Sequence, residues 1–91
     1  MLNSKQKQIL KGQAHGLKPV VLMGNHGLTE AVLKEIDLAL KAHELIKVRI
    51  QADDRDEKNM IVSQICQNNQ AELVQLIGNI CVLYRENPEK N

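Results

Sequence analysis

The chain has 91 residues and a formal net charge of +1, and its apolar fraction of 43% is enough for one small hydrophobic core. Tyr84 is the only aromatic residue, which argues against RNA recognition by bases stacked on aromatic side chains. No segment approaches the ~20 apolar residues of a membrane span, and the start of the chain has no apolar signal segment. We therefore expect a single domain over residues 1–91 in the cytoplasm, with Cys66 and Cys81 as free thiols.

The first predicted element is a helix over residues 4–15, capped by Asn3 or Ser4. An apolar stripe is expected along it at Ile9, Leu10, Ala14 and Leu17. This part of the chain is also basic, because residues 1–20 carry four lysines and no acid. The four are Lys5, Lys7, Lys11 and Lys18. Such a segment is either a solubilising surface or a contact for a polyanion.

A short buried strand is expected at residues 20–23, followed by a Gly-Asn-His-Gly turn and then a long amphipathic helix. Thr29 is the expected N-cap of that helix. The charged residues of the helix fall on one side, which we expect to be solvated: Glu30, Lys34, Asp37, Lys41 and Glu44. The opposite side is expected to pack on the core through Val32, Ile36, Ala39, Leu40 and His43.

Residues 45–50 alternate and predict a strand, with Ile46, Val48 and Ile50 on one face and Lys47 and Arg49 on the other. A third helix is expected over 55–68, with Asp54 and Glu57 as a capping box. Its predicted inward residues are Met60, Ile61, Ile65 and Cys66. Strands at 72–77 and 80–85 around Gly78-Asn79 predict a hairpin.

The predicted order is thus helix, strand, helix, strand, helix, strand, strand. Strand–helix–strand units favour parallel pairing, whereas a hairpin is antiparallel. The expected fold class is α/β (α+β), a mixed four-stranded sheet packed with three helices. The order of the strands in the sheet is not determined by the pattern.

No set of residues indicates catalysis or a metal centre. His15, His26 and His43 are scattered, and no cysteine or histidine pair has the spacing of metal ligands. An acidic run occurs at residues 53–57, where carboxylates either cap the coming helix or hold a hard cation such as Mg²⁺. We favour capping, and we expect no cofactor, metal or small-molecule substrate.

The Gly24-Asn25-His26-Gly27 turn has two interpretations. Its glycines either provide backbone angles that other residues avoid, or let a phosphate backbone approach a helix N-terminus. One RNA-binding module clamps nucleic acid with such a GxxG loop. The spacing alone leaves both interpretations open.

The stretch LKPVVLMGNHGLTEAVLKEIDLALKAHELIKVRI, with SKQKQILKGQAH before it and ELVQLIGNICVLYR after it, resembles the CRM domain (chloroplast RNA splicing and ribosome maturation). It is most similar to the bacterial single-domain, YhbY-type members, over about residues 2–86. The resemblance implies a fold similar to the C-terminal domain of a bacterial translation initiation factor. It also implies RNA binding through Gly24, Asn25, His26 and Gly27, to which charge placement adds Lys5, Lys7, Lys11 and Lys18.

The implied role is assembly of the large ribosomal subunit, by a monomer that binds ribosomal RNA in precursor particles. In this hypothesis the amides of Gly27 and Leu28 meet phosphate, while Asn25 and His26 bond phosphate or ribose. The family often has a basic residue between the glycines and another after the hairpin turn, where this chain has Asn25, His26 and Asn79. The tail after Arg85 is also short, so we expect fewer phosphate contacts.

Two other hypotheses stay open. A protein adaptor on the ribosome would use the charged face of the second helix. A small phosphate-ester enzyme would need a metal ion at residues 53–57.

Overall fold

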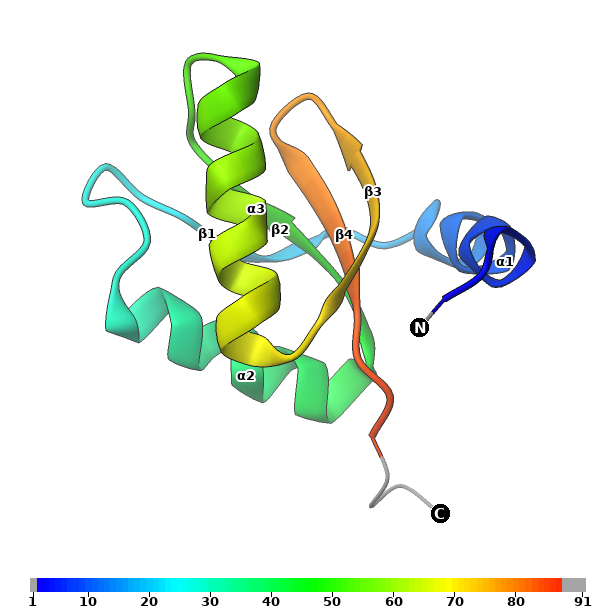
Figure 1. Cartoon of the computed structure of the whole chain (residues 1–91). Coiled ribbons are helices and arrows are strands. Elements are labelled where there is room, and N and C mark those ends of the chain that lie inside the picture. Colours follow the sequence, from blue (N-terminus) through cyan, green and yellow to red (C-terminus); the bar gives the residue numbers. More distant parts are fainter. Residues whose placement is uncertain (1, 88–91) are drawn as a thin grey trace.

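The computed structural model describes residues 2–87, so Met1 and the tail from residue 88 to 91 lie outside the description. Seven elements follow in the predicted order (Figure 1). They are α1 (Ser4–Ala14), β1 (Pro19–Leu22), α2 (Glu30–His43), β2 (Leu45–Arg49), α3 (Arg55–Asn69), β3 (Glu72–Ile77) and β4 (Ile80–Tyr84). The predicted order and fold class are confirmed, with boundaries that differ by one residue.

The four strands form one sheet in the order β1-β2-β4-β3. β1 pairs with β2 in parallel, and the other two pairings are antiparallel. The predicted hairpin turns at Gly78 and Asn79, where Gly78 has a φ of 56°. β4 lies between β2 and β3, and it suits a central position because Cys81, Val82 and Leu83 are all buried.

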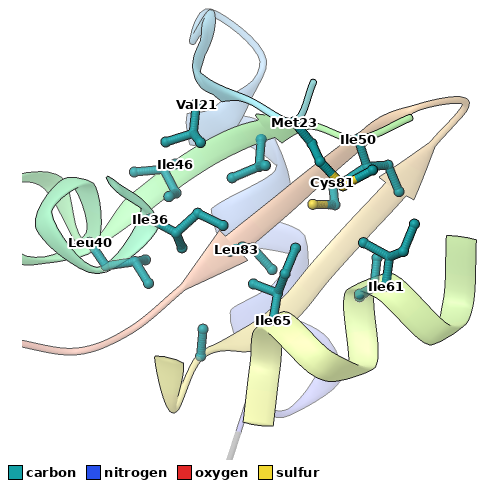
Figure 2. Close-up of a cluster of buried hydrophobic side chains, with 13 residues drawn as sticks. Val21, Met23, Ile36, Leu40, Ile46, Ile50, Ile61, Ile65, Cys81 and Leu83 are labelled. Atoms are coloured by element: carbon teal, nitrogen blue, oxygen red, sulfur yellow. The ribbon is translucent and has the colours of Figure 1, made fainter. Parts of the chain in front are cut away.

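The main core lies between the sheet and the two helices α2 and α3 (Figure 2). The alternation predicted for β2 is confirmed, since Ile46, Val48 and Ile50 are buried on this face. Both cysteines are free thiols. Burial raises the pKa of Cys81 to about 12, so this thiol has almost no thiolate character at neutral pH.

α1 lies on the opposite face of the sheet, where it covers a smaller cluster (Figure 1). Leu10 and Ala14, one helical turn apart, are its contact residues. Asn3 forms a capping box with Gln6 at the start of the helix. The predicted apolar stripe is wrong at both ends, because Ile9 and Leu17 are 54% and 39% exposed. One short helix therefore covers only part of this face.

α3 begins as predicted, with the Asp54 side chain accepting a hydrogen bond of 2.8 Å from the Glu57 amide. The Glu57 carboxylate accepts from the Asp53 amide, one residue before the cap, so the box is incomplete. The prediction that Met60 points inward is wrong, since it is 63% exposed. Ile61 and Ile65 define the buried side of the helix, and Met60 falls on its flank.

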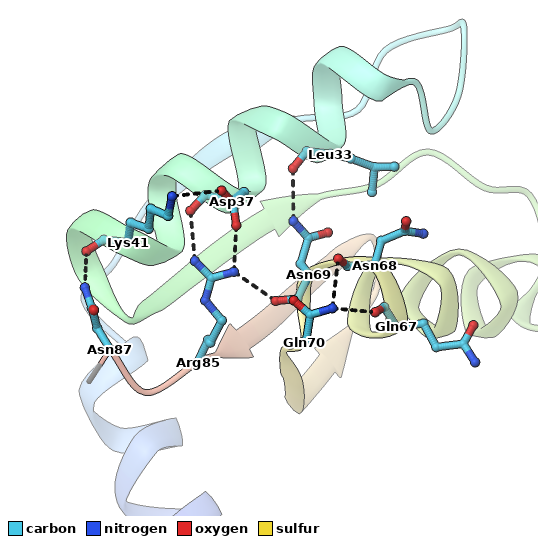
Figure 3. A network of polar contacts seen from close by, with 9 residues as sticks. All are labelled: Leu33, Asp37, Lys41, Gln67, Asn68, Asn69, Gln70, Arg85 and Asn87. Atoms are coloured by element: carbon cyan, nitrogen blue, oxygen red, sulfur yellow. Dashed lines mark hydrogen bonds and ion pairs between the residues drawn. The ribbon is translucent and has the colours of Figure 1, made fainter. Parts of the chain in front are cut away.

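Arg85 joins three elements at the end of the sheet (Figure 3). Its Nη1 donates to Asp37 Oδ1 at 2.8 Å and to the Asn69 carbonyl oxygen at 2.9 Å, and its Nη2 donates to the Asp37 carbonyl oxygen at 3.1 Å. Asn69 in turn donates from Nδ2 to the Leu33 carbonyl oxygen. Asp37 keeps 39% of its side chain exposed, as expected for the charged face of α2, but it also anchors the end of β4 to α2, which the helix pattern does not predict.

We predict that Arg85→Met lowers the free energy of unfolding by about 2 kcal/mol, the usual scale for hydrogen bonds to a charged group. Lys41→Met is the matched control. Lys41 Nζ lies 3.6 Å from the other Asp37 oxygen, but the lysine side chain is 66% exposed, so its loss should cost under about 0.5 kcal/mol. Urea denaturation at pH 7 measures both, and equal costs would contradict the anchoring role of Arg85.

The same comparison has a predicted pH dependence. The hydrogen bond from Arg85 holds the pKa of Asp37 below its ordinary value of 3.8. A carboxyl with a lowered pKa stabilises the fold fully above its unfolded pKa, and this contribution is lost as the pH falls through the folded value. The stability difference between wild type and Arg85→Met should therefore be constant above about pH 5 and shrink below pH 4. Denaturation at stepwise lower pH tests this expectation.

Candidate nucleic-acid interface

The GxxG loop, residues 24–27, projects from the carboxyl end of β1 (Figure 1). The Gly27 amide donates a hydrogen bond of 3.1 Å to the Gly24 carbonyl oxygen, which closes a tight turn. Asn25 and His26 occupy the corner of this turn, and both are exposed. The two side chains are therefore displayed at the tip of the loop.

The Gly27 amide is used inside the turn, so the expected contact of this amide with phosphate would have to replace that hydrogen bond, and it stays a prediction. The helix also starts later than the loop, since α2 begins at Glu30 with Thr29 as its N-cap. Thr29 accepts from the amides of Val32 and Leu33. The amides of Glu30 and Ala31 are thus the orphan donors of the first turn, beside the loop.

The two glycines of the loop differ in whether the fold requires a glycine. Gly27 has a φ of 78°, a conformation that side chains with a Cβ rarely adopt. Gly24 has no such angle, and a Cβ added there would meet nothing within 4 Å. The fold therefore does not require a glycine at position 24. A ligand that comes close to the backbone at this position would require one.

A groove of about 490 Å³ separates the loop from α3, and it is lined on the loop side by Gly24 and Asn25. Its other wall includes Asp53, Glu57 and the exposed Met60. Two carboxylates in this position repel a phosphate. An anionic ligand of the loop is therefore favoured on the side away from α3.

The predicted lysines are not all brought together. Lys7 and Lys11 are one turn apart on the same side of α1, whereas Lys5 lies about 200° around the helix from Lys7. Lys18 is exposed just before β1, at the opposite end of that strand from the loop. The basic segment and the loop therefore flank β1 rather than form one compact cluster.

Two cations that the sequence pattern does not assign to the site lie between these ends. Lys47 and Arg49 are on the face of β2 that looks toward α1. Lys11 and Lys47 both line a cavity of about 220 Å³ between α1 and the sheet. The alternation of residues 45–50 contained this signal, but it gives only the face of a strand and not what covers that face.

Charge is divided between the two sides of the sheet. Residues 1–29 contain no acid, and β2 contains no acid. Taken together, α2, α3 and the loop before α3 carry seven acids against four lysines and arginines. The acids there are Glu30, Glu35, Asp37, Asp53, Asp54, Asp56 and Glu57. The α1 side of the sheet is consequently the more cationic side of the molecule, although Glu72 of β3 accepts a hydrogen bond from the Leu2 amide there.

The described residues contain neither a metal-ligand cluster nor a membrane-spanning helix. No group of three or more histidines, cysteines or acids within residues 2–87 is placed to hold a metal ion. The Asp54 side chain caps α3, and the Glu57 carboxylate accepts a hydrogen bond from the Asp53 amide. No helix of the described chain is both long enough and apolar enough to cross a membrane.

Comparison with known proteins adds an independent line of information. The model of the CRS1 / YhbY (CRM) domain family matches residues 2–85. An RNA-binding protein of Haemophilus influenzae is 53% identical over 97% of this chain and 89% of its own length. A probable RNA-binding protein of Pseudomonas aeruginosa is 41% identical over 99% of this chain and 86% of its own length. The solution structure of a Staphylococcus aureus protein aligns with a TM-score of 0.87 at 37% identity, and the alignment covers all of this chain and 95% of that one.

We predict that the two glycines respond differently to substitution. Gly27→Ala should lower the free energy of unfolding by about 1 kcal/mol, because alanine is strained at this positive φ. Gly24→Ala should change it by less than about 0.5 kcal/mol, because the added methyl group meets no atom. Thermal or urea unfolding of the two variants measures the difference. Gly27→Asn is the control, since asparagine tolerates positive φ and should cost less than alanine.

Proposed function

This chain belongs to the CRS1 / YhbY (CRM) domain family, and we propose that it is a non-catalytic RNA-binding protein that assists assembly of the large ribosomal subunit. Its partners would be ribosomal RNA and the precursor particles of that subunit, in the cytoplasm. It would act as one domain spanning the chain and as a monomer. Relatives from two bacteria carry RNA binding in their names. The observation that carries the proposal is the group of cations in α1, before β1 and in β2, which lie on the α1 side of a sheet that ends in an open GxxG loop.

RNA would be held mainly through its backbone. Lys7, Lys11 and Lys18 would supply attraction to phosphates that does not depend on sequence. Gly24 would let the backbone come close to the turn, where Asn25 and His26 bond phosphate or ribose. The orphan amides at the start of α2 would add a positive partial charge beside the loop.

The adaptor hypothesis has less support. Of the four residues on the α2 face that it would use, Asp37 and Lys41 form an ion pair with each other. Asp37 is also held by Arg85. Half of that face is therefore already engaged inside the molecule, whereas the lysines before β1 form no ion pair within residues 2–87.

We predict that Lys7→Ala/Lys11→Ala/Lys18→Ala and Gly24→Glu each weaken binding to naked ribosomal RNA and to large-subunit precursor particles. If four to six phosphates are contacted, log affinity should fall with log salt at a slope of about −3 to −4. The triple variant should make this slope shallower by about 2, at roughly 0.7 for each lost contact. Filter binding at several salt concentrations and co-sedimentation with particles measure these effects.

Matched controls separate the site from a general loss of charge. Lys34→Ala/Lys41→Ala/Lys58→Ala removes the same number of lysines from α2 and α3, and Gly24→Ala tests the loop position without a charge. The lysine variant should bind as wild type does, whereas Gly24→Ala should weaken binding less than Gly24→Glu, because its methyl group hinders the close approach without adding a charge. If the α2 and α3 variant leaves the particles while the other triple variant stays bound, the adaptor hypothesis replaces this proposal.

A further inference from the structure

A row of side chains crosses all four strands at the loop end of the sheet. Leu22 of β1 lies in register with Arg49 of β2, Arg49 lies opposite Ile80 of β4, and Ile80 lies opposite Ile77 of β3. Residues paired in this way point to the same face of a sheet. The neighbouring row through Val21, Val48 and Cys81 is buried against α2 and α3. This row therefore points to the α1 side.

α1 leaves most of this row uncovered, although its C-terminal end borders Ile77 and the half-buried Ile80. Leu22 and Ile77 are 64% and 61% exposed, and Arg49 is exposed between them. The next row toward α1 contains Lys47, in the cavity that Ile77 and Ile80 also line. We call these five residues the open sheet strip: Leu22, Lys47, Arg49, Ile77 and Ile80. With strands about 4.8 Å apart, the strip is about 14 Å wide, and Leu22 lies two residues before the GxxG loop.

The chemistry of the open sheet strip restricts its occupant. Exposed aliphatic side chains favour a ligand with apolar, flat surfaces, and two cations without an acid among them favour an anionic ligand. Unpaired RNA offers both, since its phosphates are anionic and the faces of its bases are accessible. Duplex RNA hides its base faces and presents mainly phosphates and 2′-hydroxyl groups. An arginine side chain can also stack its planar guanidinium on a base.

We propose that the open sheet strip binds an unpaired segment of RNA, which continues from the phosphates held at the GxxG loop. Arg49 stacks on a base, Leu22, Ile77 and Ile80 contact base and ribose surfaces, and Lys47 pairs with phosphate. The strip thereby makes the protein prefer unpaired over duplex RNA. This inference rests on the proposed RNA-binding function and adds the class of RNA that the site selects.

The test compares two RNA probes of the same sequence, a single-stranded oligonucleotide and its fully paired duplex, by fluorescence anisotropy over a range of salt. Leu22→Ser/Ile77→Ser should weaken binding of the single strand about tenfold and leave its salt slope unchanged, because only non-ionic contacts are lost. Duplex binding should change less than twofold. Met60→Ser is the matched control, since Met60 is equally exposed on the acidic side of the loop and should bind as wild type does.

Two Arg49 variants test stacking separately from charge. Arg49→Lys keeps the cation but loses the planar group, so it should weaken single-strand binding about fivefold or more with the same salt slope. Arg49→Ala should weaken it further and make the slope shallower by about 0.7. All variants change exposed positions, and unfolding curves establish that each is folded.

The other outcomes are distinct. If Gly24→Glu abolishes RNA binding while the strip variants bind both probes as wild type does, the strip inference is wrong and the proposed function stands. Equal losses on single strand and duplex also overturn it. Strip variants that bind RNA normally but leave precursor particles would indicate a protein partner on the strip instead. If wild type binds neither probe nor the particles, the proposed function itself fails.

Discussion

The alternation of side chains along β2 is the constraint on which both the core and the candidate interface depend. Ile46 and Val48 are fully buried against the two-helix layer, whereas Lys47 and Arg49 point to the face that α1 only partly covers. A shift of register by one residue would place both cations in the core. Because β2 pairs with β1 on one side and β4 on the other, its register also fixes which residues of those strands accompany the cations.

The elements of this fold could be predicted from sequence because each has a local signal. Helix caps at Asn3, Thr29 and Asp54 and the two-residue turn at Gly78-Asn79 are short-range features, and all are present. The position of β4 between β2 and β3 could not be predicted, because strand order depends on contacts between distant segments. The errors at Met60 and Ile9 have the same origin, since periodicity identifies a helix side but not how wide a partner surface covers it.

In the candidate site too, local features could be predicted from sequence and contacts between distant residues could not. The glycine spacing located the loop, and the absence of acids located the basic segment. The internal hydrogen bond of the Gly27 amide was not predictable, because it depends on the turn geometry and not on composition. For Asp37 the helix position predicts the partly exposed side chain, but it does not predict the hydrogen bond from Arg85, 48 residues away. Arg49 could not be assigned to the site from sequence, because its neighbours across the sheet depend on the strand order.

The residues that cap α3 also determine on which side of the GxxG loop an anionic ligand is favoured. Asp54 starts this helix by accepting the Glu57 amide, and the Glu57 carboxylate accepts from Asp53, so the hydrogen bonds that begin α3 also fix acidic groups beside the groove next to the loop. Replacing Glu57 to admit phosphate would remove the acceptor of the Asp53 amide and weaken the start of α3. The side of the loop away from α3 leads instead to Leu22 and the cations of β2. The interactions that start α3 therefore also direct an anionic ligand toward the open face of the sheet.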